Sequence, residues 1–434
     1  MLKKNSYKNT HIGNHKLHPE TQMMSYGYDP FMSEGAVKPP VFLTSTFAFK
    51  SAEDGADFFD VASGRKAAPQ DSVGGLIYSR FNHPNLEIIE DRIALLEDGE
   101  VCNIFSSGMA AISSTFLALL KPNDIIVHSS PLYGGTESII RNALKNWDIS
   151  SFEFSDGLNQ EVIEQTLEVA AKAGHIGMIF IENPANPTNA LVDFKKVKNA
   201  VDKFEKKHGY RITTACDNTL LGPIFQKPLL HGIDLVCYSL TKYVAGHSDL
   251  VAGAVIGRKE LMDKVRNIRN AFGSQLDPHS SWMISRSLET LFLRMKRAEE
   301  SALEIADWMK NNSYSKVKIF HPKHIEDKDY QATFKKQCDG CGSTFSFVIE
   351  GGRKKAFELI NSLKLFKSAV SLGGTESLVC HPASTTHSGL PEDLRNNFGI
   401  SEGLIRFSIG IENPKDLIAD LDNTFKKVFG RSSP

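Results

Sequence analysis

Residues 177–217 read GMIFIENPANPTNALVDFKKVKNAVDKFEKKHGYRITTACD and contain the pattern that decides the fold. Two short apolar runs, GMIFIE and RITTACD, flank residues 194–207, where apolar side chains recur at helical spacing. Similar short runs lie at 124–128 (DIIVH) and 234–240 (DLVCYSL), and another helical stretch spans 160–172. Strands that alternate with helices predict an α/β fold with a mostly parallel sheet.

The chain divides into three predicted parts. Residues 1–77 form a polar arm and then an extended segment rich in Gly and Pro. Residues 78–272 form the large domain that contains the predicted sheet. Residues 273–434 begin with a long helical stretch and form a smaller α+β domain, with a strand in SEGLIRFSIGIE near its end. Within the first part, the polar and breaker-rich segment 62–75 indicates a surface loop or insertion.

Composition excludes several classes of function. Lys plus Arg number 50 against 51 Asp plus Glu, so the net charge of -1 provides no basic field for nucleic acid or anionic lipid. No apolar stretch approaches the length of a membrane span, and no leader pattern opens the chain. Six cysteines are too sparse for a disulfide framework, which favours the cytoplasm. Cys338 and Cys341 form a lone CxxC with no second pair, so we predict no metal.

Polar residues at the ends of the predicted strands are the first candidates for chemistry, because sites in open α/β sheets form beyond the carboxyl ends of strands. Asp217 closes one strand, and Lys242 follows another, between glycines and beside Ser239 and Thr241. A partly desolvated lysine loses its proton easily, as an imine-forming lysine must. Taken alone, a solvated surface lysine is the commoner interpretation.

The neighbouring groups favour a pyridoxal 5'-phosphate site. A buried Asp217 could hold a protonated pyridine nitrogen, which keeps the cofactor ring an electron sink. The backbone N–H groups of Gly108 and Met109, in SSGMAA, would open a helix and bind a phosphate, and Ser239 and Thr241 could add hydroxyls. Each feature has a structural explanation by itself, and only their conjunction points to the cofactor.

Nine phrases carry a resemblance that covers nearly the whole chain: PPVFLTSTF, YSRFNHPNLEIIEDRIALLE, SSGMAAI, YGGT, ENPANPT, DNT, SLTKYVAGHSDLVAGAVIG, SLGGTESLVCHPASTTH and GISEGLIRFSIGIE. In this order they resemble the Cys/Met-metabolism family of fold-type-I pyridoxal-phosphate enzymes. That family includes methionine γ-lyase, cystathionine γ-synthase and γ-lyase, and O-acylhomoserine sulfhydrylases. The resemblance implies a large cofactor domain and a smaller C-terminal domain.

The resemblance also implies roles for single residues. Lys242 matches the Schiff-base lysine, Asp217 the partner of the pyridine nitrogen, and Tyr133 the tyrosine that stacks on the ring and assists proton transfer near the γ-leaving group. Asn186 matches a group near the ring oxygen, and Arg406 the arginine that grips the substrate carboxylate. The positions that match phosphate contacts are Gly108, Met109, Ser239 and Thr241.

Three further matches concern the substrate and the assembly. Ser371 matches a residue that lines the substrate pocket. Tyr78 and Arg80 match residues that reach the phosphate of the neighbouring subunit, and segment 1–77 would reach that subunit too. The resemblance therefore implies a homotetramer built from dimers with shared active sites.

The expected reaction is γ-elimination or γ-replacement on a sulfur-containing or homoserine-derived amino acid, with methionine γ-lyase-like cleavage preferred. Val370 stands where cystathionine-handling members tend to carry glutamate, which favours this choice. Gly135, Arg269 and Asn270 depart from the Cys, Lys and Asp of methionine γ-lyases. Cystathionine γ-synthase, O-acylhomoserine sulfhydrylase and cystathionine γ-lyase activities remain alternatives. An aminotransferase and a catalytically silent cofactor-binding protein are alternatives of other classes.

Overall fold

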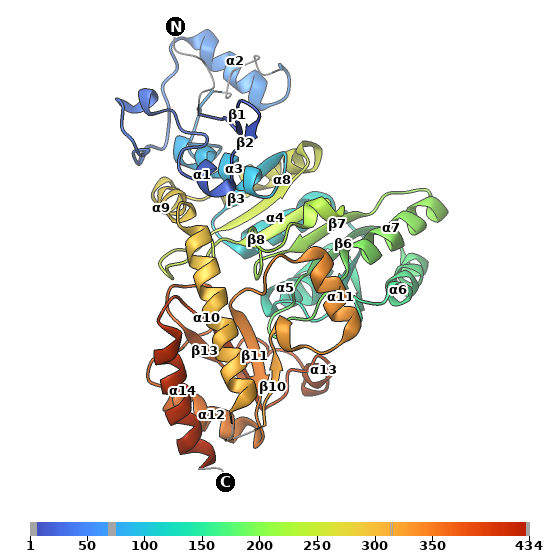
Figure 1. The fold of residues 1–434 in the computed structure, drawn as a ribbon. Coiled ribbons are helices and arrows are strands. Elements are labelled where there is room, and N and C mark those ends of the chain that lie inside the picture. The colour runs from blue at the N-terminus through green and yellow to red at the C-terminus, as the bar shows by residue number, and fades with distance from the viewer. Residues whose placement is uncertain (1–6, 68–74, 313, 315, 431–434) are drawn as a thin grey trace.

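A seven-stranded sheet forms the centre of the computed structural model, which describes residues 7–67, 75–312, 314 and 316–430. Its strands are β3 (Val101–Phe105), β4 (Ile125–Ser129), β5 (Ser150–Phe154), β6 (Ile176–Glu182), β7 (Thr213–Asp217), β8 (Leu235–Ser239) and β9 (Gly253–Gly257). They lie in the order β3-β9-β8-β7-β6-β4-β5 (Figure 1). β9 runs antiparallel to β3 and β8, while β8, β7, β6, β4 and β5 are parallel. The prediction of a mostly parallel α/β sheet is confirmed.

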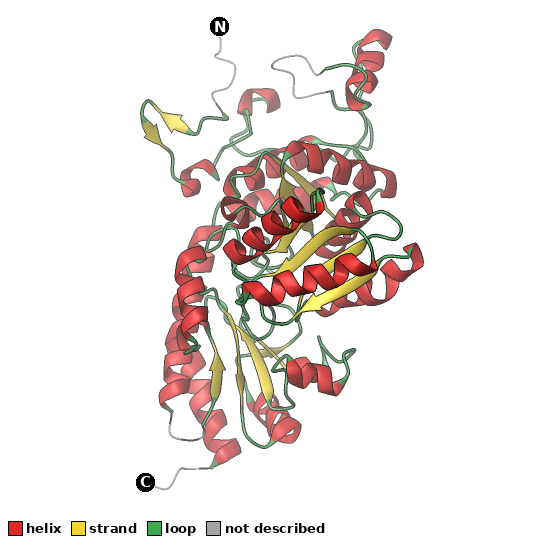
Figure 2. Cartoon of the chain, turned by 90° about the vertical axis from the view of Figure 1, so that its right-hand side faces the viewer, coloured by secondary structure: helices red, strands yellow, loops and turns green. Residues whose placement is uncertain are grey.

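Helices cover both faces of this sheet, as Figure 2 shows. One face packs against α4 (Gly108–Leu119) and α8 (Lys259–Phe272); the other packs against α3 (Pro84–Leu96), α6 (Gln160–Ala173) and α7 (Phe194–His208). The rings of Phe116 in α4 and Phe180 in β6 meet edge to face, with centroids 5.1 Å apart. Both faces of the parallel strands are therefore apolar, which explains their continuous apolar sequence.

A second, smaller sheet lies towards the C-terminus. Its strands, in spatial order, are β10 (Lys318–Phe320), β11 (Thr344–Val348), β14 (Leu404–Ser408), β13 (Leu378–Cys380) and β12 (Lys367–Ser368). The helices α10 (Leu291–Asn311), α12 (Gly352–Ser362) and α14 (Pro414–Phe429) pack against it over a core that includes Phe345, Phe347 and Phe407. α9 (Pro278–Leu288) precedes α10, which runs alongside the smaller sheet (Figure 1). The domain boundaries at 77/78 and 272/273 stay predictions.

The N-terminal elements lie at the end of the molecule opposite α14 (Figure 1). They are β1 (His11–Ile12), β2 (His15–Lys16), α1 (Pro19–Gln22), the 3₁₀ turn η1 (Pro30–Ser33) and α2 (Ala52–Ala62). Sequence alone does not predict α2, although Ser51 caps it by accepting a hydrogen bond from the Asp54 N–H. Of the predicted loop 62–75, residues 68–74 lie outside the described part of the chain.

The remaining helical elements are short. They are α5 (Gly134–Ser138), the π-helical η2 (Ile139–Ala143), η3 (Leu144–Trp147), η4 (Pro228–His231), η5 (Pro322–His324), α11 (Lys328–Gln337), η6 (Pro382–Ser384) and α13 (Glu392–Asn397).

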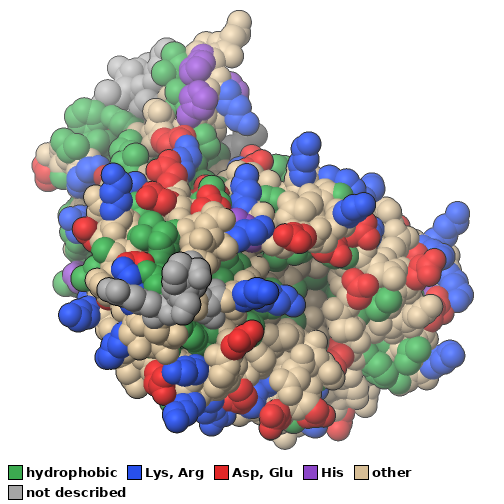
Figure 3. Space-filling view, turned by 60° about the horizontal axis from the view of Figure 1, so that its bottom comes forward, with side chains coloured by type: hydrophobic (Ala, Val, Ile, Leu, Met, Phe, Trp, Pro, Cys, Tyr) green, Lys and Arg blue, Asp and Glu red, His purple; other side chains and the backbone are tan. Residues whose placement is uncertain are grey.

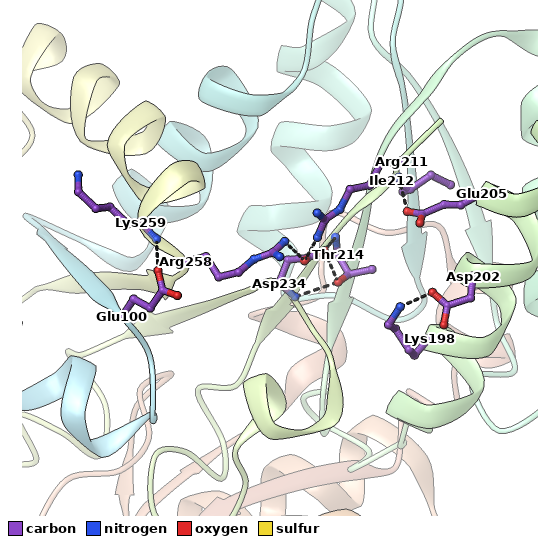
Figure 4. Close-up of polar contacts among 10 residues, drawn as sticks. All are labelled: Glu100, Lys198, Asp202, Glu205, Arg211, Ile212, Thr214, Asp234, Arg258 and Lys259. Carbon is purple, nitrogen blue, oxygen red and sulfur yellow. Dashed lines mark hydrogen bonds and ion pairs between the residues drawn. The ribbon is translucent and has the colours of Figure 1, made fainter. Parts of the chain in front are cut away.

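Asp234 organises the amino-terminal ends of β7 and β8 (Figure 4). Its carboxylate pairs with Arg211 at 2.6 Å and with Arg258 at 2.7 Å, and accepts a hydrogen bond from the Thr214 N–H. These contacts join the two strands at the edge opposite their carboxyl ends. Asp234 therefore supports the sheet at a distance from the predicted chemistry.

The molecular surface shows no single-sign field on the face drawn in Figure 3, where basic and acidic side chains are interspersed. Among the described helices, none is both long enough and apolar enough to cross a bilayer.

Candidate active site

Lys242 lies just beyond the carboxyl end of β8, and its Nζ donates a hydrogen bond to Ser371 Oγ at 3.0 Å. Burial and, to a smaller extent, the positive charge of Arg406 together lower the pKa of this amine from 10.5 to about 8. A substantial fraction of Lys242 is therefore neutral near physiological pH, as a nucleophilic amine requires.

Gly373 lets the loop that carries Ser371 approach Lys242 closely. Its φ is +77°, and a Cβ at this position would lie only 2.7 Å from the Tyr243 backbone nitrogen. The Gly373 N–H donates to Ser408 Oγ at 2.9 Å, which ties the loop to β14. Only glycine combines this conformation with this proximity.

Arg406 lies in the middle of β14 and is 2% exposed. Its Nη1 donates to Asn186 Oδ1 at 3.1 Å, and Nη2 donates to the carbonyls of Val370 and Ser371 at 2.8 and 2.9 Å. Within the described residues, these partners are all neutral oxygens, and the buried Nε of Arg406 has no hydrogen-bond partner. A buried guanidinium held by neutral oxygens fits an anionic ligand such as an amino-acid carboxylate.

Asp217 ends β7 and is buried beside Glu182, its partner in the β6–β7 register. Its Oδ1 accepts hydrogen bonds from the Thr219 N–H at 3.1 Å and the Thr219 hydroxyl at 2.6 Å, whereas no described residue donates to Oδ2. Burial raises the pKa of the Asp217 carboxyl. A buried carboxylate without a cationic partner is costly, so the protonated pyridine nitrogen of pyridoxal 5'-phosphate fits this position.

Glu182 holds together two residues that the sequence places near the cofactor. Its Oε1 accepts a hydrogen bond from the Asn186 N–H at 2.9 Å, and its Oε2 accepts one from the Tyr133 N–H. Burial, and next the charge of Asp217, raise the pKa of Glu182 well above its usual range. The sequence alone does not assign Glu182 a role, although an acidic residue that closes an apolar strand is the signal that could have found it.

The N-terminus of α4 offers the expected anion site. Ser107 caps the helix by accepting a hydrogen bond from the Ala110 N–H at 3.0 Å. A Cβ on Gly108 would lie 2.9 Å from the Ser239 Cβ, so only a glycine fits between the helix and β8. The first N–H groups of the helix and the Ser239 hydroxyl therefore face one region, as phosphate binding requires.

Thr241 and Met109, the other two predicted phosphate contacts, have different neighbours. The Thr241 hydroxyl donates to the Ala252 carbonyl at 3.2 Å and accepts from the Ala252 N–H at 3.0 Å, so it also fixes the connection from β8 to β9. Met109 and Tyr133 both border Gly135, since a Cβ there would lie 3.0 Å from Met109 Sδ and 2.7 Å from Tyr133 Cε1.

Tyr78 and Arg80 have no hydrogen bond to the other predicted site residues among those that the structure describes. Tyr78 is 41% exposed, and Arg80 donates to the Asn270 carbonyl while its guanidinium lies 4.6 Å from the centre of the Phe81 ring. Across the described residues, no hydrogen bond links either side chain to Lys242. Their predicted role in the site of a second subunit stays a prediction.

Arg269 has a structural role inside its own subunit. It is 1% exposed, pairs with Glu90 and donates to the carbonyls of Ile104 at 3.0 Å and Phe81 at 3.1 Å. Arg269 stands where the resemblance leads us to expect a lysine. Its contacts join α8 to α3 and β3, so the arginine has a structural role at this position.

Two features lie outside this constellation. Ligand atoms of His128, Glu137 and Glu153 lie within 4.8 Å of one another, but Arg141 pairs with both glutamates, at 2.6 and 2.5 Å, and supplies the positive charge there. The absence of a metal stays a prediction. A cleft of about 680 Å³ between the two sheets has none of the predicted site residues in its lining.

Comparison with known proteins identifies the family. Residues 20–426 match the model of the Cys/Met metabolism PLP-dependent enzymes. The chain belongs to this family. It is 37% identical to an L-methionine gamma-lyase from Pseudomonas deceptionensis over 94% of this chain and 97% of that protein. Pyridoxal 5'-phosphate is therefore its cofactor, and it is a lyase or transferase of sulfur amino-acid metabolism.

Solved structures of family members share the fold. A cystathionine gamma synthase from Xanthomonas oryzae superposes with a TM-score of 0.83 at 32% identity, covering 95% of this chain and 98% of that one. A Campylobacter jejuni protein assigned as O-acetylhomoserine (thiol)-lyase superposes with a TM-score of 0.84 at 28% identity, covering 94% and 100%. The latter contains a pyridoxyl-lysine phosphate, in which the cofactor is joined to a lysine.

Proposed function

We propose that this chain catalyses γ-elimination on a sulfur-containing amino acid, with L-methionine as the preferred substrate and a thiol, 2-oxobutanoate and ammonia as products. The observation that carries the proposal is the convergence of Lys242 and Arg406 on Ser371. Lys242 donates to the Ser371 hydroxyl, and Arg406 donates to the Ser371 carbonyl. An α-amino acid whose carboxylate binds Arg406 would present its amino group and Cα–H towards Lys242.

The cofactor, when bound, supplies an electron sink that stabilises negative charge at the substrate Cα. The Lys242 amine would take the Cα proton and move a proton at Cβ. Asp217 would keep the pyridine nitrogen protonated. Tyr133 would stack on the ring and assist proton transfer at the departing γ-substituent.

γ-Replacement is the second candidate, as in a cystathionine γ-synthase or an O-acylhomoserine sulfhydrylase. The segment HPASTTHS (381–388), which resembles sulfhydrylases slightly more than lyases, lies beside the loop that carries Tyr133. A Cβ on Gly134 would overlap the Thr386 carbonyl. This proximity supports a proposed influence of the segment on which group enters or leaves at Cγ.

The enzyme is further proposed to act in the cytoplasm as a homotetramer of dimers that share active sites. All six cysteines are free thiols, which suits a reducing compartment. Large apolar side chains are exposed along the N-terminal segment, including Phe31 at 65%, Met32 at 80%, Val37 at 82% and Leu43 at 76%. An exposed apolar surface of this kind is typical of a protein interface. A second subunit whose active site receives Tyr78 and Arg80 would bury it.

The test is to incubate cofactor-saturated protein with L-methionine, L-cystathionine, L-homocysteine or O-acylhomoserine, with and without added thiol. 2-Oxobutanoate and thiol from methionine alone would support the proposed lyase. Thioether formed only from O-acylhomoserine plus thiol would establish γ-replacement instead. Stoichiometric amino-group transfer without loss of the γ-substituent would identify an aminotransferase, and no product from any substrate would overturn the proposal.

A further inference from the structure

Glu182 occupies a position that none of the assigned roles explains. It ends β6 and is 5% exposed, and no cationic side chain among the described residues donates a hydrogen bond to it. Both carboxylate oxygens accept from backbone N–H groups, and those two groups belong to different segments of the chain. A buried carboxylate on a strand end is expensive, so its retention there needs a reason.

The two segments that Glu182 joins are both proposed to contact the cofactor. Tyr133 follows β4 and opens α5, and Asn186 lies in the turn that follows β6. The side chain of Asn186 in turn accepts from Arg406 at 3.1 Å. A continuous series of hydrogen bonds therefore runs from Arg406 through Asn186 and Glu182 to the backbone of Tyr133.

We propose that Glu182 is a positioning residue, whose two carboxylate oxygens set the relative placement of the Tyr133 ring and the Asn186 amide around the cofactor. This inference rests on the proposed function, because it takes Tyr133 and Asn186 as cofactor contacts. A carboxylate suits the task since each of its oxygens accepts, whereas an amide offers one acceptor and one donor. The raised pKa of Glu182 indicates that this placement is maintained against an electrostatic penalty.

Two substitutions separate geometry from charge. Glu182→Gln keeps the size but sets an NH₂ group against one of the two N–H donors. Glu182→Asp keeps the charge but is one methylene too short to reach both donors. If Glu182 acts by position, both variants lose function; if only its charge beside Asp217 matters, Glu182→Asp behaves as the wild type.

The matched control is Glu97→Gln. Glu97 is also fully buried in the large domain, but its oxygen accepts from the Tyr238 hydroxyl, and none of the assigned site residues is its partner. It therefore reports what the loss of a buried carboxylate does to the fold alone. All proteins are compared as cofactor-bound holoenzymes by thermal unfolding, cofactor dissociation, visible circular dichroism of the bound cofactor, and kcat and KM.

For both Glu182 variants we expect an altered visible dichroism and a kcat/KM lowered by roughly tenfold or more, the effect of one buried N–H left unpaired. The control should lose stability without a change in dichroism. The inference is overturned if Glu182→Asp matches the wild type, or if Glu182 and Glu97 variants change dichroism equally. The dichroism and dissociation measurements need no turnover, so they remain decisive even if the proposed γ-elimination is not found.

Discussion

Replacing Lys242 by methionine is expected to stabilise the cofactor-free protein at neutral pH. The pKa of Lys242 is about 8 in the folded chain against 10.5 ordinarily. At about 1.4 kcal/mol for each pKa unit, protonated Lys242 disfavours the folded state by about 3 kcal/mol below pH 8. Losing the hydrogen bond to Ser371 offsets about 1 kcal/mol of the gain. The net stabilisation by Lys242→Met at pH 7 is therefore about 2 kcal/mol.

The sign of the pH dependence is fixed by the direction of the shift. Between pH 8 and 10.5 the unfolded chain still binds the proton that folded Lys242 has lost, so wild-type stability rises with pH across this window. The advantage of Lys242→Met should shrink over the same window, pass through zero and become a loss of about 1 kcal/mol at its upper end, where only the missing hydrogen bond to Ser371 remains.

Denaturant unfolding of both cofactor-free proteins, followed from pH 7 to 10.5, measures this difference directly. Lys264→Met replaces an exposed lysine on α8 and should show no such pH-dependent gain. A Lys242→Met protein less stable than the wild type at pH 7, or a difference that does not change with pH, would refute the reasoning.

Three further changes test the site. Arg406→Gln removes the proposed partner of the substrate carboxylate. It should lower kcat/KM at least ~30-fold, as for the loss of one partner of a buried ion pair, while cofactor absorbance is retained. A loss below about threefold would contradict the role. Gly135→Ala would bring a Cβ within 2.7 Å of the Tyr133 ring, displacing it and lowering turnover, whereas Gly389→Ala meets open space and serves as the control. Arg80→Ala should speed cofactor loss from the intact oligomer, measured by dialysis; unchanged retention would argue against a phosphate contact between subunits.

Local sequence was sufficient for the elements of the large sheet. The apolar runs that end at Glu182 and Asp217 are β6 and β7, and the helical spacing of residues 194–207 is α7 within one residue. Such segments are readable because parallel strands are buried on both faces and surface helices on one. By contrast, α2 (Ala52–Ala62) has only Gly55 buried, so packing imposed little apolar periodicity on its sequence.

Some of the candidate site residues could likewise be predicted from local sequence, and others could not. Lys242, Asp217 and Gly108 lie at strand and helix ends, and their positions follow from the α/β pattern. The roles of Tyr78, Arg80 and Arg406 came only from family resemblance. The hydrogen-bond partner of the Arg406 side chain, Asn186, is 220 positions away in sequence, and the proposed partners of Tyr78 and Arg80 belong to another subunit. The burial of Arg269 and its ion pair could not be predicted from the sequence, because its partner Glu90 is 179 positions away in the chain.

The sequence by itself therefore determined the order of strands and helices, the lysine that follows a strand, and the family. Tertiary structure alone decided that Arg406, in the second sheet, meets Asn186, in the turn after β6 of the first sheet, and that the charge of Arg406 lies close enough to lower the pKa of Lys242. It also decided that Glu182 joins Tyr133 to Asn186. The physical reason is that periodicity and turn chemistry report neighbours along the chain, whereas hydrogen bonds and charge act between whatever groups folding brings together.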